Sequence, residues 1–579
     1  MSKSIYFELS FSEPQAHYVD VKMHVKGFQD QAYIDLKMPV WTPGSYLIRE
    51  YSKNVERLIV RNPLEEEINV QKISKNTWRI LQPTDNIIIS YAVYGFEVSV
   101  RTSFIDDSRA FISSAGTFMY IDNFLELESE VKINLFKGWN KISTGLEKTE
   151  VENTFYAPNF DILFDSPIEI GNQDTWSFDV DGILHECAMT GQADYDKTQL
   201  THDITKIVRE ENKIWGSNPN NYYLFVTHNY QNGSGGLEHL NSTILAASRF
   251  GYSQPSSYKN YLSLVAHEYF HLWHVKRLRP KELGPFDYEN ENYTTGLWII
   301  EGFTSYYDNL IIRRCGFFDE TEYLQKLSSD FNTVYNRPGY LLQSAAASSF
   351  DTWIKQYRPD ENSQNVAISY YNKGAMHAVA LDIKIIAYTN GAKRLDDVMK
   401  AAYEHFYLIE NRGFEENEFQ ALAEEVTGVK LDDIFRAAHN TEDLDYNQYF
   451  NLVGYELIDK AEEQDHQTLG IKIGSNEGHT IIKNVDRDSA AWKAGLNVGD
   501  ELIAINNHRI EINGRALDYV LSNAKEQEVA DILISRDGLL REIKVPLFPT
   551  KKKSFNIQRL INVSPEQRQL GNLWLSLNN

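Results

Sequence analysis

The chain has 579 residues, a formal net charge of −24 at pH 7 and 42% hydrophobic residues. A chain of this length can bury several hydrophobic cores, so we expect three or more globular domains. The acidic balance excludes a large basic surface for nucleic acid or anionic membranes, and no apolar run reaches the roughly 18 residues that a membrane-spanning helix needs. The two cysteines, Cys187 and Cys315, are too few for a disulfide framework.

The start of the sequence, from Met1 to Leu9, leads directly into an alternating strand pattern and has no apolar signal-peptide core. We therefore predict a cytoplasmic protein, or a periplasmic one if a signal sequence has been removed. The sequence does not define an oligomeric state.

Short alternating strands follow one another up to about Asp165. Segments such as 18–25 and 86–94 alternate apolar and polar residues, which is typical of strands with one buried face. We predict an antiparallel, sandwich-like β domain over residues 1–165. The next region, residues 166–455, mixes strands with helical stretches and becomes mainly helical from about residue 255, so we expect a second domain there.

Two glycine-containing turns interrupt these patterns. Residues 38–51 combine two prolines and a glycine with aromatics and an arginine, so they form either a packed loop or part of a substrate cleft, and we favour packing. In the second turn, Gly235 and Gly236 allow the backbone to approach a ligand closely, and Glu238 is the acid beside them.

The strongest chemical signal is His267-Glu268-x-x-His271, which follows an apolar run at 261–266. In a helix, residues four apart lie on one face, so both histidines can offer imidazole nitrogens to a single ion. Glu268 lies about 100° further round the helix, where its carboxylate can take a proton from water beside the metal. The alternative is a surface helix that carries two histidines.

A catalytic zinc ion needs a third protein ligand and an open position. His274 lies about 10.5 Å along the helix axis from His267, too far for three imidazoles to surround one ion at about 2 Å. Glu301 interrupts a largely apolar, helical stretch at 297–307, and a lone carboxylate is costly to bury unless it is paired or bound to metal. We therefore predict Glu301 as the third ligand. The alternative is a solvent-facing residue on an amphipathic helix.

Further along, residues 369–375 open a helix and contain Tyr371. Tyrosine is abundant in this chain and usually packs, but a phenol near a metal-bound carbonyl could also stabilise an oxyanion. Residues 463–548 alternate short apolar strands with glycine turns, which predicts a compact β-rich module. The remaining tail, 549–579, is polar, and its order cannot be judged from the sequence.

Taken together, these motifs resemble the glycyl aminopeptidase family of PDZ-containing zinc metallopeptidases, within the gluzincins, whose third zinc ligand is glutamate. A series of motifs in the same order is far more specific than any one of them. The matching segments are Pro39-x-Trp41-x-Pro43-Gly44-Ser45-Tyr46, Gly235-Gly236-Leu237-Glu238-His239, His267-Glu268-Tyr269-Phe270-His271-Leu272-Trp273, Lys276-Arg277-Leu278-Arg279-Pro280, Leu297-Trp298-x-x-Glu301-Gly302, Asp351-Thr352-Trp353 and Tyr371-x-Lys373-Gly374.

The resemblance implies a multidomain α+β chain: an N-terminal antiparallel β domain, a thermolysin-like catalytic domain with a helical second half, and a C-terminal PDZ domain. By similarity to M1-type aminopeptidases, Glu238 would bind a substrate's free α-amine and Tyr371 would donate to the oxyanion. Leu237 and His239 stand where those enzymes carry Met and Asn. His274 stands where Asn is expected, and it would either tune the zinc or pack.

We therefore expect a zinc-dependent aminopeptidase with one Zn²⁺ per chain, held by His267, His271 and Glu301. The resemblance implies small N-terminal residues such as Gly or Ala. The alternatives are a PDZ-guided zinc endopeptidase and a catalytically idle peptide-binding scaffold. The presence of Glu268 together with the metal ligands argues against the scaffold, because a site without catalytic activity does not need a general base. The expected partners are peptide substrates and, at the PDZ domain, a peptide or protein C-terminus.

Overall fold

The computed structural model contains two compact units. It describes residues 3–463, 467–525, 528–548 and 552–575. The first unit comprises residues 1–293, 307–317 and 396–419, and the second comprises residues 294–306, 318–395 and 420–579. The predicted boundary between the PDZ module and the tail touches residues 549–551, which lie outside the described ranges, as does Met1.

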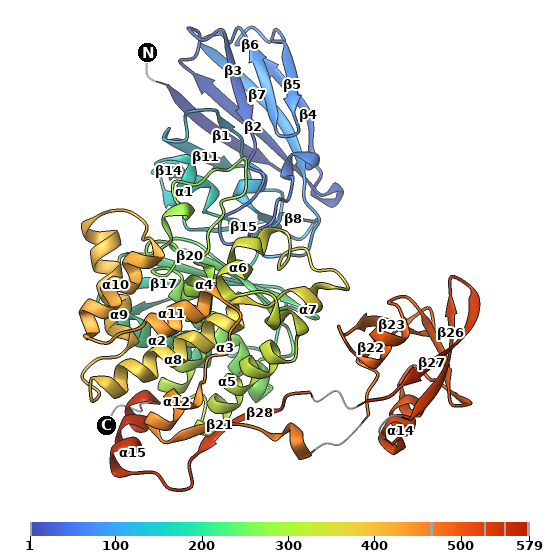
Figure 1. Ribbon diagram of the computed structural model, residues 1–579. Helices are drawn as coiled ribbons and strands as arrows, with labels where there is room; N and C mark the ends of the chain where they lie inside the picture. The colour runs from blue at the N-terminus through green and yellow to red at the C-terminus, as the bar shows by residue number, and fades with distance from the viewer. Residues whose placement is uncertain (1–2, 464–466, 526–527, 549–551, 576–579) are drawn as a thin grey trace. The chain divides into compact units, whose positions relative to one another are not determined.

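The N-terminal part of the first unit is built from β-sheets (Figure 1). Its largest sheet has the strand order β13-β14-β11-β1-β2-β7-β4, in which β1 and β11 pair in parallel and the other neighbours are antiparallel. The strands are β1 (Ser4–Ser10), β2 (Tyr18–Lys26), β4 (Val55–Arg61), β7 (Asn86–Tyr94), β11 (Ser129–Ile133), β13 (Glu147–Lys148) and β14 (Thr154–Ala157).

Alternation along these strands buries one face, as the sequence pattern predicts. In β2, Val19, Val21, Met23 and Val25 are buried, whereas the residues between them are at least partly exposed. A second sheet, ordered β10-β3-β6-β5, shares this core. Its strands are β3 (Tyr33–Lys37), β5 (Val70–Ser74), β6 (Thr77–Leu81) and β10 (Tyr120–Ile121).

A further sheet of the first unit carries Gly236 and Glu238 on its edge strand. Its order is β16-β17-β18-β20-β19, with β17, β18 and β20 parallel and β19 antiparallel at the edge. The strands are β16 (Asp174–Val180), β17 (Ile183–Thr190), β18 (Tyr222–Tyr230), β19 (Gly236–Glu238) and β20 (Ser242–Ser248). Helix α3 (Pro255–Phe270) packs against β19 and β20 and against α2 (Lys197–Trp215).

Helices make up much of the second unit (Figure 1). Helix α5 (Glu320–Tyr335) packs on α8 (Tyr370–Tyr388), whose interior residues are almost all buried. Helix α4 (Leu297–Arg314) starts in this unit, and its residues from Tyr307 onward are assigned to the first. Strands β21 (Tyr455–Asp459) and β28 (Phe555–Arg559) pair antiparallel, and α15 (Pro565–Trp574) follows β28.

The chain between β21 and β28 contains a small module with its own hydrophobic core. Its sheet runs β22-β23-β24-β26-β27. The elements are β22 (Ile471–Asn476), β23 (His479–Val485), α13 (Ala490–Ala494), β24 (Glu501–Ile505), α14 (Arg515–Asn523), β26 (Val529–Arg536) and β27 (Leu539–Pro546).

The predicted fold class is confirmed: a β-rich N-terminal domain, a helical middle region and a C-terminal β-rich module. None of the helices in the described part of the chain has the length and apolar character that a membrane crossing requires.

Candidate active site

Helix α3 presents its two histidines on one face. The helix ends at Phe270, but His271 keeps helical backbone angles (φ −63°, ψ −19°), so the four-residue spacing from His267 still brings the rings together. Their Nε2 atoms lie 3.1 Å apart. Two nitrogens held at about 2.0–2.1 Å from one tetrahedral ion take a similar separation.

The Nδ1 atom of each ring is fixed by a hydrogen-bond partner. Nδ1 of His267 lies 3.0 Å from a carboxylate oxygen of Asp308, and Nδ1 of His271 lies 2.7 Å from the backbone carbonyl of His274. If each Nδ1 carries its proton and donates, each Nε2 keeps its lone pair for a metal ion. Partners of this kind also fix the ring orientation.

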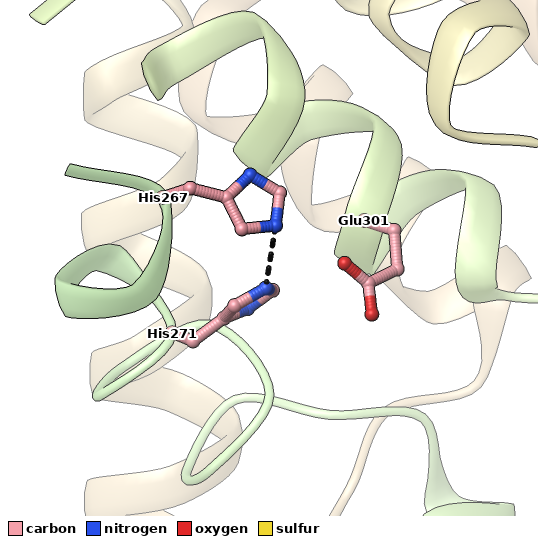
Figure 2. Close-up of side chains that lie close together, drawn as sticks. All are labelled: His267, His271 and Glu301. Atoms are coloured by element: carbon pink, nitrogen blue, oxygen red, sulfur yellow. Dashed lines mark hydrogen bonds between the residues drawn. The ribbon is translucent and has the colours of Figure 1, made fainter. Parts of the chain in front are cut away.

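Glu301 supplies the third donor. Its carboxylate is buried, with 2% of the residue exposed. One ligand atom from each of His267, His271 and Glu301 lies within 4.8 Å of the others, and Figure 2 shows the three side chains pointing toward a common centre. Glu301 and Asp308 are seven residues apart on α4, about two turns, so one face of this helix carries both acids.

These donors fit a zinc ion. Two imidazoles and one carboxylate are a donor set that catalytic zinc takes, and the open fourth position serves water or substrate. His274 lies outside the cluster: its ring is fully buried and packs near Trp215 and Phe270. The backbone carbonyl of His274 lies 2.7 Å from Nδ1 of His271 and so supports that ring.

Glu268 lies beside the donor cluster on the same helix and is 4% exposed. A Cβ atom placed on Gly236 would lie 2.2 Å from a carboxylate oxygen of Glu268. Only glycine permits so close an approach between β19 and the acid. The glycine turn found in the sequence therefore lies directly against the predicted general base.

Glu238 ends the same edge strand and is 4% exposed. Among the described residues, no hydrogen-bond donor is found for its Oε1 atom. Burial of a carboxylate oxygen without a hydrogen bond costs free energy. A Cβ on Gly44 would lie 2.4 Å from this oxygen, and Gly44 has a left-handed φ of +83°. The N-terminal turn at 38–51 thus contacts Glu238. Its aromatic residues Trp41 and Tyr46 are buried, as expected for a packed loop.

An ion-pair network holds the turn that follows Glu238. The carboxylate of Asp165 lies 2.6 Å from Lys276 Nζ and 3.1 Å from His239 Nδ1, and it accepts a hydrogen bond from the backbone N–H of Leu240 at 2.7 Å. Burial raises the pKa of Asp165, but the charge of Lys276 and the bond with His239 outweigh it and lower the value to about 2. His239 therefore positions the turn beside Glu238.

Tyr371 lies in the first turn of α8 and is half-buried. Burial, the negative charge of Glu301 and a hydrogen bond with Tyr357 raise its pKa well above the ordinary value of 10, so the phenol keeps its proton and can donate.

Helices α4 and α8 approach each other closely at two glycines. A Cβ on Gly302 of α4 would lie 2.4 Å from the Cα of Gly374 of α8.

Sequence reasoning overlooked the supporting residues. Asp308 could have been found from its two-turn spacing after Glu301. Asp165 could not have been found from the sequence, because its partners Lys276 and His239 are far away along the chain.

Two histidines on one helix face and a buried carboxylate are typical metal ligands of a metallopeptidase, and an adjacent acid is its typical general base. Comparison with protein-family models shows which metallopeptidases the chain resembles. Residues 6–172 match the Peptidase M61 N-terminal domain, residues 260–377 match the M61 glycyl aminopeptidase domain, and residues 467–547 match a PDZ domain. The chain therefore carries the domains of the M61 glycyl aminopeptidase family, which confirms the resemblance found in the sequence.

One solved structure matches nearly the whole chain. The chain is similar to the crystal structure of an aminopeptidase N family protein from Idiomarina loihiensis, with a TM-score of 0.91 and 28% identity over 99% of this chain and 100% of that one. An M1 zinc metallopeptidase from Deinococcus radiodurans gives a TM-score of 0.47 at 11% identity, over 77% of this chain and 95% of that one. A search of curated proteins finds no match.

Proposed function

We propose that this protein is a zinc-dependent aminopeptidase that removes the N-terminal residue of peptides. The observation that carries the proposal is the position of Glu238, a nearly buried carboxylate on the strand whose Gly236 contacts Glu268. Two residues of a strand span about 6–7 Å. An ammonium group bound at Glu238 would therefore put the first peptide bond of a substrate near Glu268.

His267, His271 and Glu301 would hold the zinc ion. When bound, zinc supplies Lewis acidity, which polarises a peptide carbonyl and lowers the pKa of water toward 7. Glu268 then takes a proton from the attacking water and delivers it to the leaving amine. Its carboxylate is held between α3 and Gly236.

Glu238 anchors the substrate. A carboxylate that pairs with the α-ammonium group fixes the register of the peptide, so that cleavage falls after the first residue. Tyr371 donates a hydrogen bond to the oxygen that becomes negatively charged during attack. At neutral pH the phenol carries its proton already at the ordinary pKa of 10, so it can donate this hydrogen bond.

The experiment compares free and N-acetylated forms of the same small peptides, with glycine or alanine first. Wild type should cleave only the free form. Glu238→Gln keeps the side-chain size but removes the charge, and should lower kcat/KM on free-amine peptides by roughly ten- to a few-hundredfold while the bound zinc is unchanged.

Two outcomes would contradict the proposal in different ways. Internal cleavage of acetylated peptides at the rate of free ones would favour the zinc endopeptidase. Bound zinc without turnover on any peptide would favour the idle scaffold. A similar loss in Glu238→Gln on free and blocked peptides would show that Glu238 supports the fold and does not bind the amine.

A further inference from the structure

Arg101 of the N-terminal β domain reaches the edge strand that carries Glu238. Its Nη2 atom donates a hydrogen bond to the backbone carbonyl of Gly236 at 3.1 Å. Among the described strands, β19 ends its sheet and has β20 on one side. The carbonyl of Gly235 accepts from the N–H of Ala246 in β20, and successive carbonyls of a strand point to opposite sides. Arg101 therefore lies at the outer edge of β19, where an extended peptide would pair.

The backbone of Arg101 is fixed by three hydrogen bonds. Its N–H donates to the hydroxyl of Ser99 at 3.1 Å, and its carbonyl accepts from the hydroxyls of Tyr51 at 3.1 Å and Ser113 at 3.2 Å. Tyr51 is buried and belongs to the segment 38–51, which also contacts the carboxylate of β19 through its glycine. One packed segment thus supports both charged groups, so the guanidinium is held near the strand before a substrate binds.

Glu238 and Arg101 provide opposite charges at two positions along β19. Glu238 carries the negative charge, and Arg101 is bound at Gly236, two residues before it. Residues two apart in a strand are separated by about 6–7 Å. The ammonium group and the carboxylate of an extended dipeptide have a similar separation, because two residues span at most about 7 Å. A dipeptide whose ammonium group is bound at Glu238 therefore brings its carboxylate within reach of Arg101.

The arginine distinguishes the end of a peptide from a chain that continues. A guanidinium binds a carboxylate through parallel N–H···O bonds, whereas an internal peptide group or a C-terminal amide offers it no charge. It has several N–H donors, so Arg101 can keep its bond to Gly236 while it binds a carboxylate. A longer peptide added along the outer edge would need the carbonyl of Gly236 as an acceptor, and Arg101 already donates to it. A dipeptide ends before this point and gains an ion pair.

We propose that Arg101 binds the C-terminal carboxylate of dipeptides, so that the preferred substrates are zwitterionic dipeptides whose ammonium group pairs with Glu238. The inference rests on the proposed aminopeptidase function, which sets the register of the peptide. It makes Arg101 a specificity determinant for substrate length and for the charge of the C-terminus.

The test uses the zinc-loaded full-length protein and three substrates: the dipeptide Gly-Ala, its C-terminal amide and the tripeptide Gly-Ala-Ala. Wild type should cleave the dipeptide with a kcat/KM about tenfold or more above the other two, because only the dipeptide forms the ion pair. Arg101→Gln keeps a donor for Gly236 but no charge, and should bring the three values within about threefold of one another. Arg57→Gln is the control, because Arg57 is an exposed arginine of the same domain that pairs with Asp20, and it should keep the wild-type ratios.

Each ratio compares substrates in one protein preparation, so a loss of folded protein cancels. An Arg101→Gln variant that keeps the wild-type ratios would overturn the inference, as would an equal change in Arg57→Gln. So would a wild-type enzyme that cleaves the amide and the tripeptide as fast as the dipeptide, and in that case the proposed function would stand. If wild type cleaves no free-amine peptide, both the proposed function and the inference are wrong.

Discussion

Glu301 is the residue on which the metal hypothesis depends most, because it supplies the negative charge of the donor cluster. Its burial is consistent with a ligand role, since the charge of a buried carboxylate must be compensated. Asp308, two turns further along α4, orients His267 through Nδ1. One helix thus serves both the ion and one of its imidazole ligands.

We expect Glu301→Ala to lose most of the zinc from a protein that otherwise holds about one ion per chain, because two imidazoles alone bind zinc weakly. His274→Ala should keep most of its zinc, since the carbonyl that supports His271 belongs to the backbone. Zinc content after dialysis, measured by atomic emission, distinguishes the two variants. Full zinc in Glu301→Ala would contradict the ligand assignment.

Glu268→Gln tests proton transfer separately from metal binding. The amide has nearly the same size as the carboxylate and should fit against Gly236, but it cannot accept the proton of water. We expect unchanged zinc content and unfolding temperature, with kcat lowered at least about a hundredfold. An active variant would mean that another group is the base.

At the scale of elements, Asp165 joins the end of α1 (Phe160–Phe164) to the turn after β19 and to Lys276, which follows α3. These three segments come from distant parts of the sequence, and one carboxylate contacts all of them. Its loss should therefore loosen the turn that carries Glu238.

The pKa of Asp165 predicts how this contribution varies with pH. The folded value of about 2 lies below the ordinary value of 3.8, so the ionised form is favoured in the folded state. The stabilisation is then fully present above pH 3.8 and is lost as the pH falls toward 2. At pH 7, we expect Asp165→Asn to cost about 2 kcal/mol of stability and to lower the unfolding temperature.

The control for this variant is Asp30→Asn, because Asp30 is exposed. Thermal unfolding should be followed from pH 7 down to pH 3. The difference between wild type and Asp165→Asn should shrink below about pH 4. A difference that stays constant over this range would show that shape, and not charge, is what Asp165 contributes.

At the scale of the whole molecule, the PDZ module is an insertion between two paired strands. Asp459 of β21 is the register partner of Phe555 of β28, so the segments that precede and follow the module lie side by side. The segment after the module is integral to the fold, because Trp574 of α15 is fully buried and donates to the hydroxyl of Tyr306 on α4 at 3.1 Å.

We therefore expect two deletions of the C-terminal region to behave differently. Replacing residues 464–551 by a short Gly-Ser linker should leave a folded peptidase that keeps its zinc and cleaves short peptides at a near wild-type rate. Deleting residues 552–579 should destabilise the protein, since loss of one buried tryptophan already costs about 3–5 kcal/mol. Expression, zinc content and unfolding temperature measure both effects, and a stable truncation with full zinc would refute this assignment.

The sequence alone determined the features that depend on local periodicity. The spacing of His267 and His271 fixes their shared face, because the period of a helix is the same wherever it occurs. Alternation in β2 identified its buried face for a similar reason. The order of motifs indicated the resemblance to the glycyl aminopeptidases and the domain types that the family models match.

Only the tertiary structure decided which distant residues meet. Gly44 lies against Glu238, and Asp165 binds Lys276 and the turn after Glu238. Strand β28 pairs with β21, although the order of the tail could not be judged from the sequence. No periodicity encodes such contacts, because they depend on how several elements pack at once.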